Sequence, residues 1–173
     1  MEQLSTQLVA FKQHGYVNNK QAAYFHTLHQ LPEKDQAVVQ VDFSENASII
    51  CQDEIQSAHW SHTQVAIYTV VAWTVTGTFS YVVTSDYLSH DKYAVYVFNK
   101  KIINILQEQM NGNLKVIDFF SDGATQHFKQ KYSFLAATLF LLEGVHVNWH
   151  FFATSHGKGA VDGVGGTVKR TVH

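Results

Sequence analysis

The order of strand-like and helix-like segments is the feature of this sequence that most limits its possible folds. Three runs rich in Val, Ile, Thr and aromatic residues come first, at 37–43, 63–75 and 77–86. Such runs are typical of strands, and Gly77 between the second and third predicts a hairpin. Two more runs, at 114–120 and 147–154, each follow a segment with helical periodicity. The order β-β-β-α-β-α-β predicts an α/β fold: a five-stranded mixed sheet of three antiparallel strands and then right-handed parallel crossovers, flanked by helices.

The two helical segments between the later strands have recognisable boundaries. Apolar residues recur at helical spacing over 94–106, with Ser89 as the expected N-cap and Asn111-Gly112 as the expected end. A second helix is predicted over 124–142, after Asp122-Gly123. Both helices would serve as crossovers between parallel strands and cover the sheet.

The residues before the first strand predict a further helical element. Residues 3–30 have the pattern of an amphipathic helix, or of two helices broken near His14-Gly15. The chain of 173 residues has the length of one domain with a sizeable core. We therefore expect an N-terminal helical extension at 1–36 and one α/β domain at 37–173.

Composition excludes several classes of protein. Cys51 is the only cysteine, so the chain can form neither an intramolecular disulfide nor a thiolate-rich zinc site, which favours a reducing compartment. The first residues lack the basic start and apolar block of a secretory signal. The longest apolar run, 134–142, is too short to span a membrane, so we expect no membrane partner. The net charge of −2 gives no sign of nucleic-acid binding by itself.

Carboxylates follow three of the predicted strands. Asp42 ends the first strand in VQVDFSEN, Asp122 follows the fourth in DFFSDGA, and Asp162 comes after the fifth. Chemistry in such sheets lies at the carboxyl ends of parallel strands, so the three acids converge if these strands are neighbours. Hard oxygen ligands suit Mg²⁺ or Mn²⁺, and two such ions can activate a water or a 3′-hydroxyl in phosphodiester chemistry. We therefore expect these acids to hold a pair of ions.

Each acid also has a simpler structural interpretation. Asp122 before Gly-Ala is a common type of N-cap, and Asp162 in a glycine-rich segment is typical of a turn. Asp42 is harder to explain in this way, because a carboxylate at the end of an apolar strand must be solvated, paired or bound to metal. Glu45 could be a fourth ligand or a solvated surface acid. It is the joint placement of the three aspartates that favours a metal site.

The glycine-rich segment FFATSHGKGAVDGVGG at 151–166 matches neither common phosphate loop. It lacks the upstream glycine of a Walker loop, and it does not follow a first strand as a dinucleotide-binding loop does. It could instead be a helix start kept small so that the backbone, Asp162 and a nucleic-acid strand approach closely. Lys158, Lys169 and Arg170 would then contact phosphates. The alternative is a flexible, solvated chain end.

Other chemistries have less support. Nothing in the sequence places a base beside Cys51, as a cysteine nucleophile requires. His156 could bind metal, contact phosphate or cap a helix. A zinc site would have to draw on His59, His62, His150 and His156, but no H-x-x-x-H or C-x-x-C spacing supports one.

Five separated segments together resemble a known family. They are VQVDFSEN, EIQSAHW, SDYLSHDKYAV, FFSDGATQHFK and WHFFATSHGKGAVDGVGGTVKR. From about Val38 to the C-terminus, the chain is similar to transposon-encoded proteins of animal genomes and looks like a DDE-type transposase catalytic domain of the RNase H-like, retroviral-integrase-like fold. The resemblance implies acids on the first and fourth strands and on the helix after the fifth, and Asp42, Asp122 and Asp162 match these positions.

The resemblance also implies a function. It indicates a metal-dependent polynucleotidyl transferase or nuclease of a DNA transposon, with two Mg²⁺ or Mn²⁺ ions, DNA (transposon ends and target) as partner, homo-oligomers and a nuclear location. Two features depart from the family: the third acid is Asp where many members have Glu, and we find no separate DNA-binding domain. The alternatives are a catalytically inactive, domesticated transposase fold that binds nucleic acid or protein, and a hydrolase of small phosphoesters.

Overall fold

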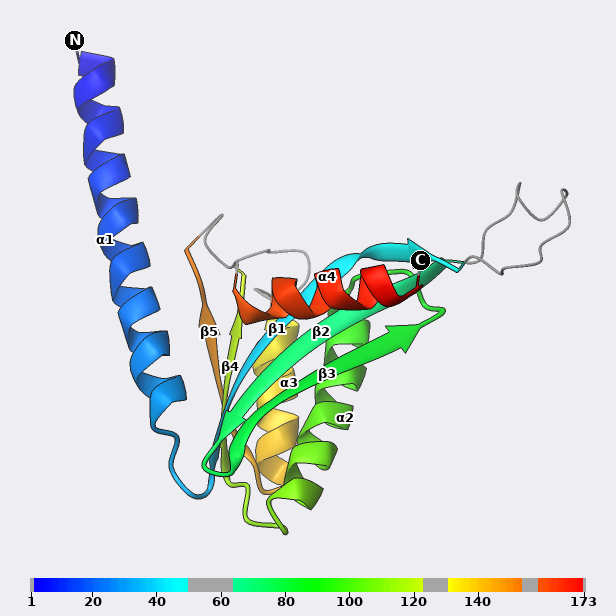
Figure 1. Ribbon diagram of the computed structural model, residues 1–173. Helices are drawn as coiled ribbons and strands as arrows, with labels where there is room; N and C mark the ends of the chain where they lie inside the picture. Colours follow the sequence, from blue (N-terminus) through cyan, green and yellow to red (C-terminus); the bar gives the residue numbers. More distant parts are fainter. Residues whose placement is uncertain (1, 50–63, 123–130, 154–158, 173) are drawn as a thin grey trace, which may run out of the picture.

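The computed structural model describes the chain except for residues 1, 50–63, 123–130, 154–158 and 173. Figure 1 shows a central sheet with helices on both of its faces. The elements in chain order are α1 (Glu2–Gln30), β1 (Gln36–Ser48), β2 (Gln64–Thr74), β3 (Gly77–Ser85), α2 (Lys92–Gln109), β4 (Val116–Ser121), α3 (Lys131–Leu142), β5 (His146–Phe151) and α4 (Ala160–Val172). None of the helices described is long and apolar enough to cross a lipid bilayer.

The sheet confirms the mixed topology predicted from the sequence. Its five strands lie in the order β3-β2-β1-β4-β5. β1, β2 and β3 pair antiparallel, and Gly77 stands at the hairpin between the last two, opposite Thr74. β4 pairs parallel with both β1 and β5. This arrangement of three antiparallel strands and two parallel crossovers is the RNase H-like sheet that the family resemblance implies.

The two faces of the sheet are covered by different pairs of helices (Figure 1). α2 and α3 pack on one face and enclose the larger core, with contributions such as Val39, Val41, Tyr68, Phe98, Ile102, Leu106, Phe119 and Phe140. α1 and α4 lie on the opposite face. There the C-terminal half of α1 covers a smaller core, in which Phe25 and Leu28 pack against Val38, Phe120 and Phe152.

Alternate residues of β1 therefore serve different helices. Val39 and Val41 belong to the core beneath α2 and α3, whereas Val38 belongs to the core beneath α1. Since successive side chains of a strand point to opposite faces, Gln40 and Asp42 share the face of Val38, on which α4 lies. The strand thus brings polar groups to one face and apolar groups to the other.

Of the two interpretations of residues 3–30, the single helix is confirmed, and one predicted N-cap is wrong. α1 is one helix that runs through His14-Gly15 without a break, because a single glycine lowers helix stability by only about 1 kcal/mol. The N-cap of α2 is Asp91 rather than Ser89, since the Asp91 carboxylate accepts hydrogen bonds from the amides of Tyr93 and Ala94 at 2.9 and 3.0 Å.

The ends of β1 and α2 show how local sequence sets the boundaries. β1 extends to Ser48, because its polar end resumes pairing with β2 after an irregularity between Ser44 and Ala47. α2 ends as predicted at Asn111-Gly112, where both residues have a positive φ of 53° and 77°. Asn and Gly are the residues that tolerate this left-handed conformation best.

Candidate functional site

Two of the three candidate acids line one cavity between the sheet and α4. The cavity has a volume of about 360 Å³. Its lining residues are Asp42, Phe43 and Ser44 of β1, Thr69 of β2, and Val161, Asp162, Gly165, Gly166 and Lys169 of α4. The wall formed by the strands and the wall formed by the helix each contribute one carboxylate. We refer to it below as the α4 cavity.

Pairing between β1 and β2 fixes the position of Asp42. Asp42 is directly opposite Thr69 in the antiparallel ladder, and the Thr69 hydroxyl donates a hydrogen bond of 3.1 Å to the backbone oxygen of Asp42. The aspartate is half-buried. On the other face of β1, the ring of Phe43 stacks on His90 at a centroid distance of 4.3 Å, and His90 Nε2 lies 2.7 Å from Asn46 Oδ1. The end of β1 is therefore held from both faces.

Glycines just before and within α4 let this helix approach the sheet closely. A Cβ atom at Gly159 would lie 2.9 Å from Gln40 Nε2, and one at Gly165 would lie 3.3 Å from Ser44 Oγ. Contacts below about 3.4 Å force the neighbouring atoms to move. Because the segment from Ala160 onward is a helix packed on the sheet, the alternative of a flexible chain end is wrong for that part. The glycine content has a structural reason, which is close helix–sheet packing.

Asp162 lies in the first turn of α4 and caps its N-terminus. Its Oδ2 accepts a hydrogen bond of 2.8 Å from the amide of Gly159, and its own amide donates to the oxygen of Gly159 at 3.2 Å. This is the role of an acidic residue at the third helical position in a capping box. A negative charge is also favourable there because of the helix dipole. Asp162 is exposed, and within the described part of the chain its Oδ1 accepts no hydrogen bond.

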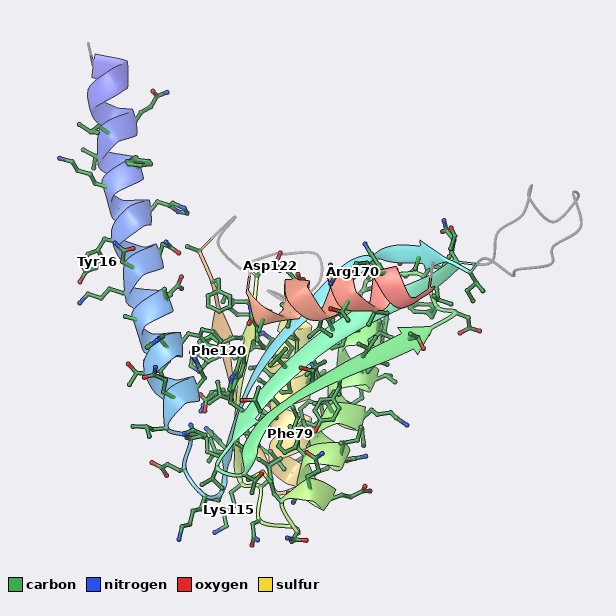
Figure 2. All side chains as sticks on the ribbon, viewed as in Figure 1. Tyr16, Phe79, Lys115, Phe120, Asp122 and Arg170 are labelled. Carbon is green, nitrogen blue, oxygen red and sulfur yellow. The ribbon has the colours of Figure 1, made fainter. Side chains whose placement is uncertain are left out.

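β4 brings Asp122 to the same edge of the sheet as Asp42. The parallel ladder between β1 and β4 ends with Gln40 opposite Phe120, and each aspartate lies two residues farther along the chain. β4 itself ends at Ser121, so Asp122 is the first residue after the strand. Asp122 is half-buried and does not line the α4 cavity (Figure 2). Among the described residues, no three His, Cys, Asp or Glu side chains lie close enough together to hold a metal ion.

The basic candidates divide between the cavity and the surface. Lys169 lines the α4 cavity about two turns after Asp162. Arg170 is exposed, and its guanidinium lies 3.4 Å from the Thr167 hydroxyl (Figure 2). Lys158 and His156 lie outside the described residues, as do Cys51, His59 and His62. The Glu45 side chain lies outside them too, and the N-cap interpretation of Asp122 depends on residues from 123 onward that are not described.

The sequence analysis missed one further carboxylate, Asp118, in the middle of β4. It is buried and accepts hydrogen bonds from Gln36 Nε2 at 2.8 Å, Asn148 Nδ2 at 3.1 Å and His150 Nε2 at 2.7 Å. Burial alone would raise the pKa of Asp118, but these three hydrogen bonds outweigh it and lower the pKa. An aspartate inside an apolar strand by itself predicts a buried network, because a buried carboxylate needs partners.

Comparison with known proteins places the chain in a family. Residues 21–173 match the family model described as "Domain of unknown function (DUF8701)". The chain belongs to this family. The matched region includes the part of α1 that packs on the sheet. No curated protein matches the chain.

Two solved structures are similar to this DUF8701 domain. One is the Mos1 transposase paired-end complex with left transposon end, with a TM-score of 0.49 and 10% identity, covering 91% of this chain and 49% of that chain. The other is the Mos1 mariner paired end complex with Mn, with a TM-score of 0.46 and 12% identity, covering 83% and 43%. The domain thus spans about half the length of these proteins or less.

The α4 cavity of this DUF8701 domain combines groups of opposite charge. Two carboxylates, Asp42 and Asp162, can bind a hard cation, and the Lys169 ammonium can bind an anion such as a phosphate. The position of Asp42 is fixed by the pairing of β1 with β2. The positions of Asp162 and Lys169 relative to Asp42 depend on how closely α4 lies on the sheet. The chemistry available to the site therefore depends on the packing of a single helix.

Proposed function

We propose that this domain is a metal-dependent polynucleotidyl transferase or nuclease of a DNA transposon. In this proposal, Asp42, Asp122 and Asp162 hold two divalent ions at the edge of the sheet. The observation that carries it is that Asp42 and Asp162, which are far apart in the sequence, line one cavity, while Asp122 directly follows β4 at the same edge of the sheet. The segments that resemble transposase catalytic domains contain the same three aspartates.

The donor atoms in the cavity fit Mg²⁺ or Mn²⁺. Carboxylate oxygens are the ligands that these hard ions prefer, and the described residues that line the cavity include no sulfur ligand. When bound, two such ions would activate water for strand cleavage and a 3′-hydroxyl for strand transfer. Asp42 would be the fixed ligand, since it lies within the antiparallel ladder between β1 and β2.

Asp162 would combine two roles. Its Oδ2 is held by the Gly159 amide, so its Oδ1 would be the oxygen directed to a metal. Aspartate is one methylene shorter than the glutamate that many DDE enzymes have at this position, so α4 must lie closer to the sheet for the carboxylate to reach. Gly159 and Gly165 permit this closer approach. The glycine-rich sequence would therefore compensate for the shorter acid.

DNA would be bound near these acids. Lys169 lines the cavity and its ammonium would contact a phosphate, with Lys158 and Arg170 as further phosphate contacts. The expected partners are the transposon ends and the target DNA, bound by a homo-oligomer in the nucleus. Phosphate contacts of this kind position the DNA and do not select its sequence.

Metal-dependent nicking of supercoiled DNA tests this function. We expect Asp42→Asn to lower the nicking rate in Mn²⁺ about a hundredfold or more, because a ligand of the ions is lost. The matched control is Asp86→Asn, since Asp86 is an exposed aspartate that does not line the cavity. Wild-type nicking by Asp42→Asn would refute the proposal. DNA binding without nicking by the wild-type protein would instead indicate an inactive, domesticated fold.

A further inference from the structure

A second cavity lies between α1 and the edge strand β5. Its volume is about 260 Å³. Aromatic rings line most of it: Tyr24 comes from α1, Phe120 from β4, and His150 and Phe152 from the end of β5. Figure 2 shows Phe120 between α1 and the strands. We call it the α1 cavity, and none of its lining residues also lines the α4 cavity.

The rings of the α1 cavity pack around Phe120. His150 stacks on Phe120 with a centroid distance of 4.5 Å and an interplanar angle of 25°. Phe152 lies 5.6 Å and Tyr24 6.3 Å from the same ring. Phe120 and Phe152 are buried, whereas Tyr24 is 49% exposed. The buried rings form the floor and Tyr24 forms the accessible rim, which gives a flat ring from solvent an aromatic surface on which to stack.

Gln21 lines the α1 cavity, and one atom of its side-chain amide has no hydrogen-bond partner among the described residues. Gln21 Nε2 donates a hydrogen bond of 2.6 Å to the backbone oxygen of Phe151, so Oε1 is the remaining atom of the amide. Gln21 Oε1 is buried and has no hydrogen-bond partner in the described part of the chain. A buried acceptor without a donor is unfavourable, so this position calls for a donor supplied by a bound molecule.

The Asp118 network orients the imidazole of His150. The Asp118 carboxylate is ionised at neutral pH, since its pKa is lowered by hydrogen bonds, and an ionised carboxylate only accepts hydrogen bonds. His150 Nε2 therefore carries the proton that is donated to Asp118 Oδ1. This hydrogen bond, together with stacking on Phe120, holds the ring plane in place. The cavity is thus organised before any ligand arrives.

We propose that the α1 cavity binds an unpaired base of a DNA strand, with a preference for bases that carry an exocyclic amino group. A base is a rigid flat ring that can stack on aromatic side chains, and its amino group can donate to Gln21 Oε1. A phenylalanine side chain of a protein partner would stack but would leave Gln21 Oε1 without a donor. This proposal does not rest on the acids of the α4 cavity, because base stacking needs no metal.

Single-stranded DNA oligomers test the stacking part of the proposal. The affinity of the full chain is measured by fluorescence anisotropy, in EDTA, for a deoxycytidine oligomer and an abasic oligomer of equal length. We expect the wild-type protein to bind the deoxycytidine oligomer more tightly. Tyr24→Ala should lower that affinity about tenfold and leave binding of the abasic oligomer unchanged. Tyr24→Phe should keep the wild-type affinity, because it keeps the ring.

Tyr16→Ala is the matched control for the stacking experiment. Tyr16 lies on the same helix, is 64% exposed and does not line the cavity (Figure 2). We expect its loss to leave both affinities unchanged. Equal wild-type affinities for the deoxycytidine and abasic oligomers would overturn the proposal. It would also be overturned if Tyr24→Ala bound the deoxycytidine oligomer like the wild type, or lost both affinities equally.

The role of Gln21 is tested with two bases that differ at one position. Cytosine carries an amino group where uracil carries a carbonyl oxygen, and the rings are otherwise nearly the same size. We expect the wild-type protein to prefer the deoxycytidine oligomer over the deoxyuridine oligomer by about threefold to tenfold, the effect of one hydrogen bond. Gln21→Leu should abolish this preference. Equal wild-type affinities for the two oligomers would overturn the assignment of Gln21 to the amino group.

Discussion

The two faces of the sheet bury different kinds of polar groups. Beneath α2 and α3, neutral groups bond in pairs: the Tyr68 hydroxyl donates to Asn99 at 2.9 Å, and Trp149 Nε1 donates to Ser121 Oγ at 3.1 Å. The face beneath α1 and α4 carries the carboxylates Asp42 and Asp118, and both cavities described above. The first face resembles an ordinary hydrophobic core, whereas the second holds groups whose burial is costly without a function or a network.

This difference separates stability from function. Buried apolar area supplies most of the stability, so the face beneath α2 and α3 should dominate the free energy of unfolding. The opposite face buries less apolar area, because carboxylates, glycines and open cavities occupy part of it. Substitutions on the two faces should therefore affect different measurements.

The largest effect on stability is expected in the core beneath α2. Ile102 is fully buried there, and Ile102→Ala should lower the free energy of unfolding by about 2–5 kcal/mol through lost burial and a residual cavity. Urea denaturation measures the change. The DNA nicking by the protein that remains folded should depend on metal as it does in the wild type. A loss of metal binding without a loss of stability would contradict the separation of the two faces.

A smaller effect with a distinct pH dependence is expected at Asp118. Asp118→Asn should lower the free energy of unfolding by about 1.5–3 kcal/mol at pH 7, the range for hydrogen bonds to a charged group. Because folding lowers the pKa of Asp118, the stabilisation is present above the ordinary aspartate pKa of about 3.9 and is lost as the pH falls through the folded value.

The difference in stability between wild type and Asp118→Asn should therefore shrink on acidification below about pH 4. Urea denaturation at a series of pH values measures it. A difference that stayed constant from pH 7 to pH 3 would show that the charge of Asp118 is not what stabilises the fold.

Two glycines of α4 provide a matched pair. A Cβ at Gly165 would lie 3.3 Å from Ser44 Oγ, whereas one at Gly163 would have no atom within 4 Å. Gly163→Ala should raise the free energy of unfolding by up to about 1 kcal/mol, the helix propensity of Ala over Gly. Gly165→Ala should raise the free energy of unfolding by less than this, or lower it. It should also weaken metal-dependent nicking, because α4 moves away from Asp42. Equal effects of both substitutions on nicking would contradict the need for close packing.

The smallest effect is expected at Lys169. If its ammonium contacts one phosphate, Lys169→Ala should reduce the slope of log K against log salt concentration by about 0.9. The slope is measured by DNA-binding titrations at several salt concentrations. Lys101→Ala is the control, because Lys101 is exposed on α2, on the opposite face of the sheet. An unchanged slope for Lys169→Ala would remove this residue from the DNA contacts.

The sequence predicted the sheet well, because each strand is a run of β-branched and aromatic residues and the order of runs restricts the topology. It also predicted that Asp42, Asp122 and Asp162 would converge, and in the structure Asp42 and Asp162 line one cavity that Asp122 does not line. It failed at the start of α2, where two local signals compete, because Ser89 and Asp91 are both good caps. It left two alternatives at Gly15, because a single glycine weakens a helix without necessarily ending it. The first strand was predicted to end at residue 43, where its apolar run ends, yet Ala47 still pairs with Val65.

The Asp118 network could not be found from local sequence. Gln36, Asn148 and His150 come from two other strands, and only the register of the parallel ladders brings them to one carboxylate. The sequence could suggest His150 only as one of four histidines for a zinc site, because it does not show that His150 bonds to Asp118. The same limit applies to the α1 cavity, since Gln21 and Tyr24 face β5 only after α1 has packed across the sheet.

Anomalous diffraction from a crystal soaked in Mn²⁺ tests whether Asp42, Asp122 and Asp162 hold a pair of metal ions. We expect two anomalous peaks about 3.5–4 Å apart, bounded by the carboxylates of Asp42, Asp122 and Asp162. Coordination would require Asp122 to reach toward the α4 cavity, which it does not line in the present arrangement. Peaks at other residues only, or no peak near Asp42 at millimolar Mn²⁺, would contradict the assignment of these three aspartates to a metal site.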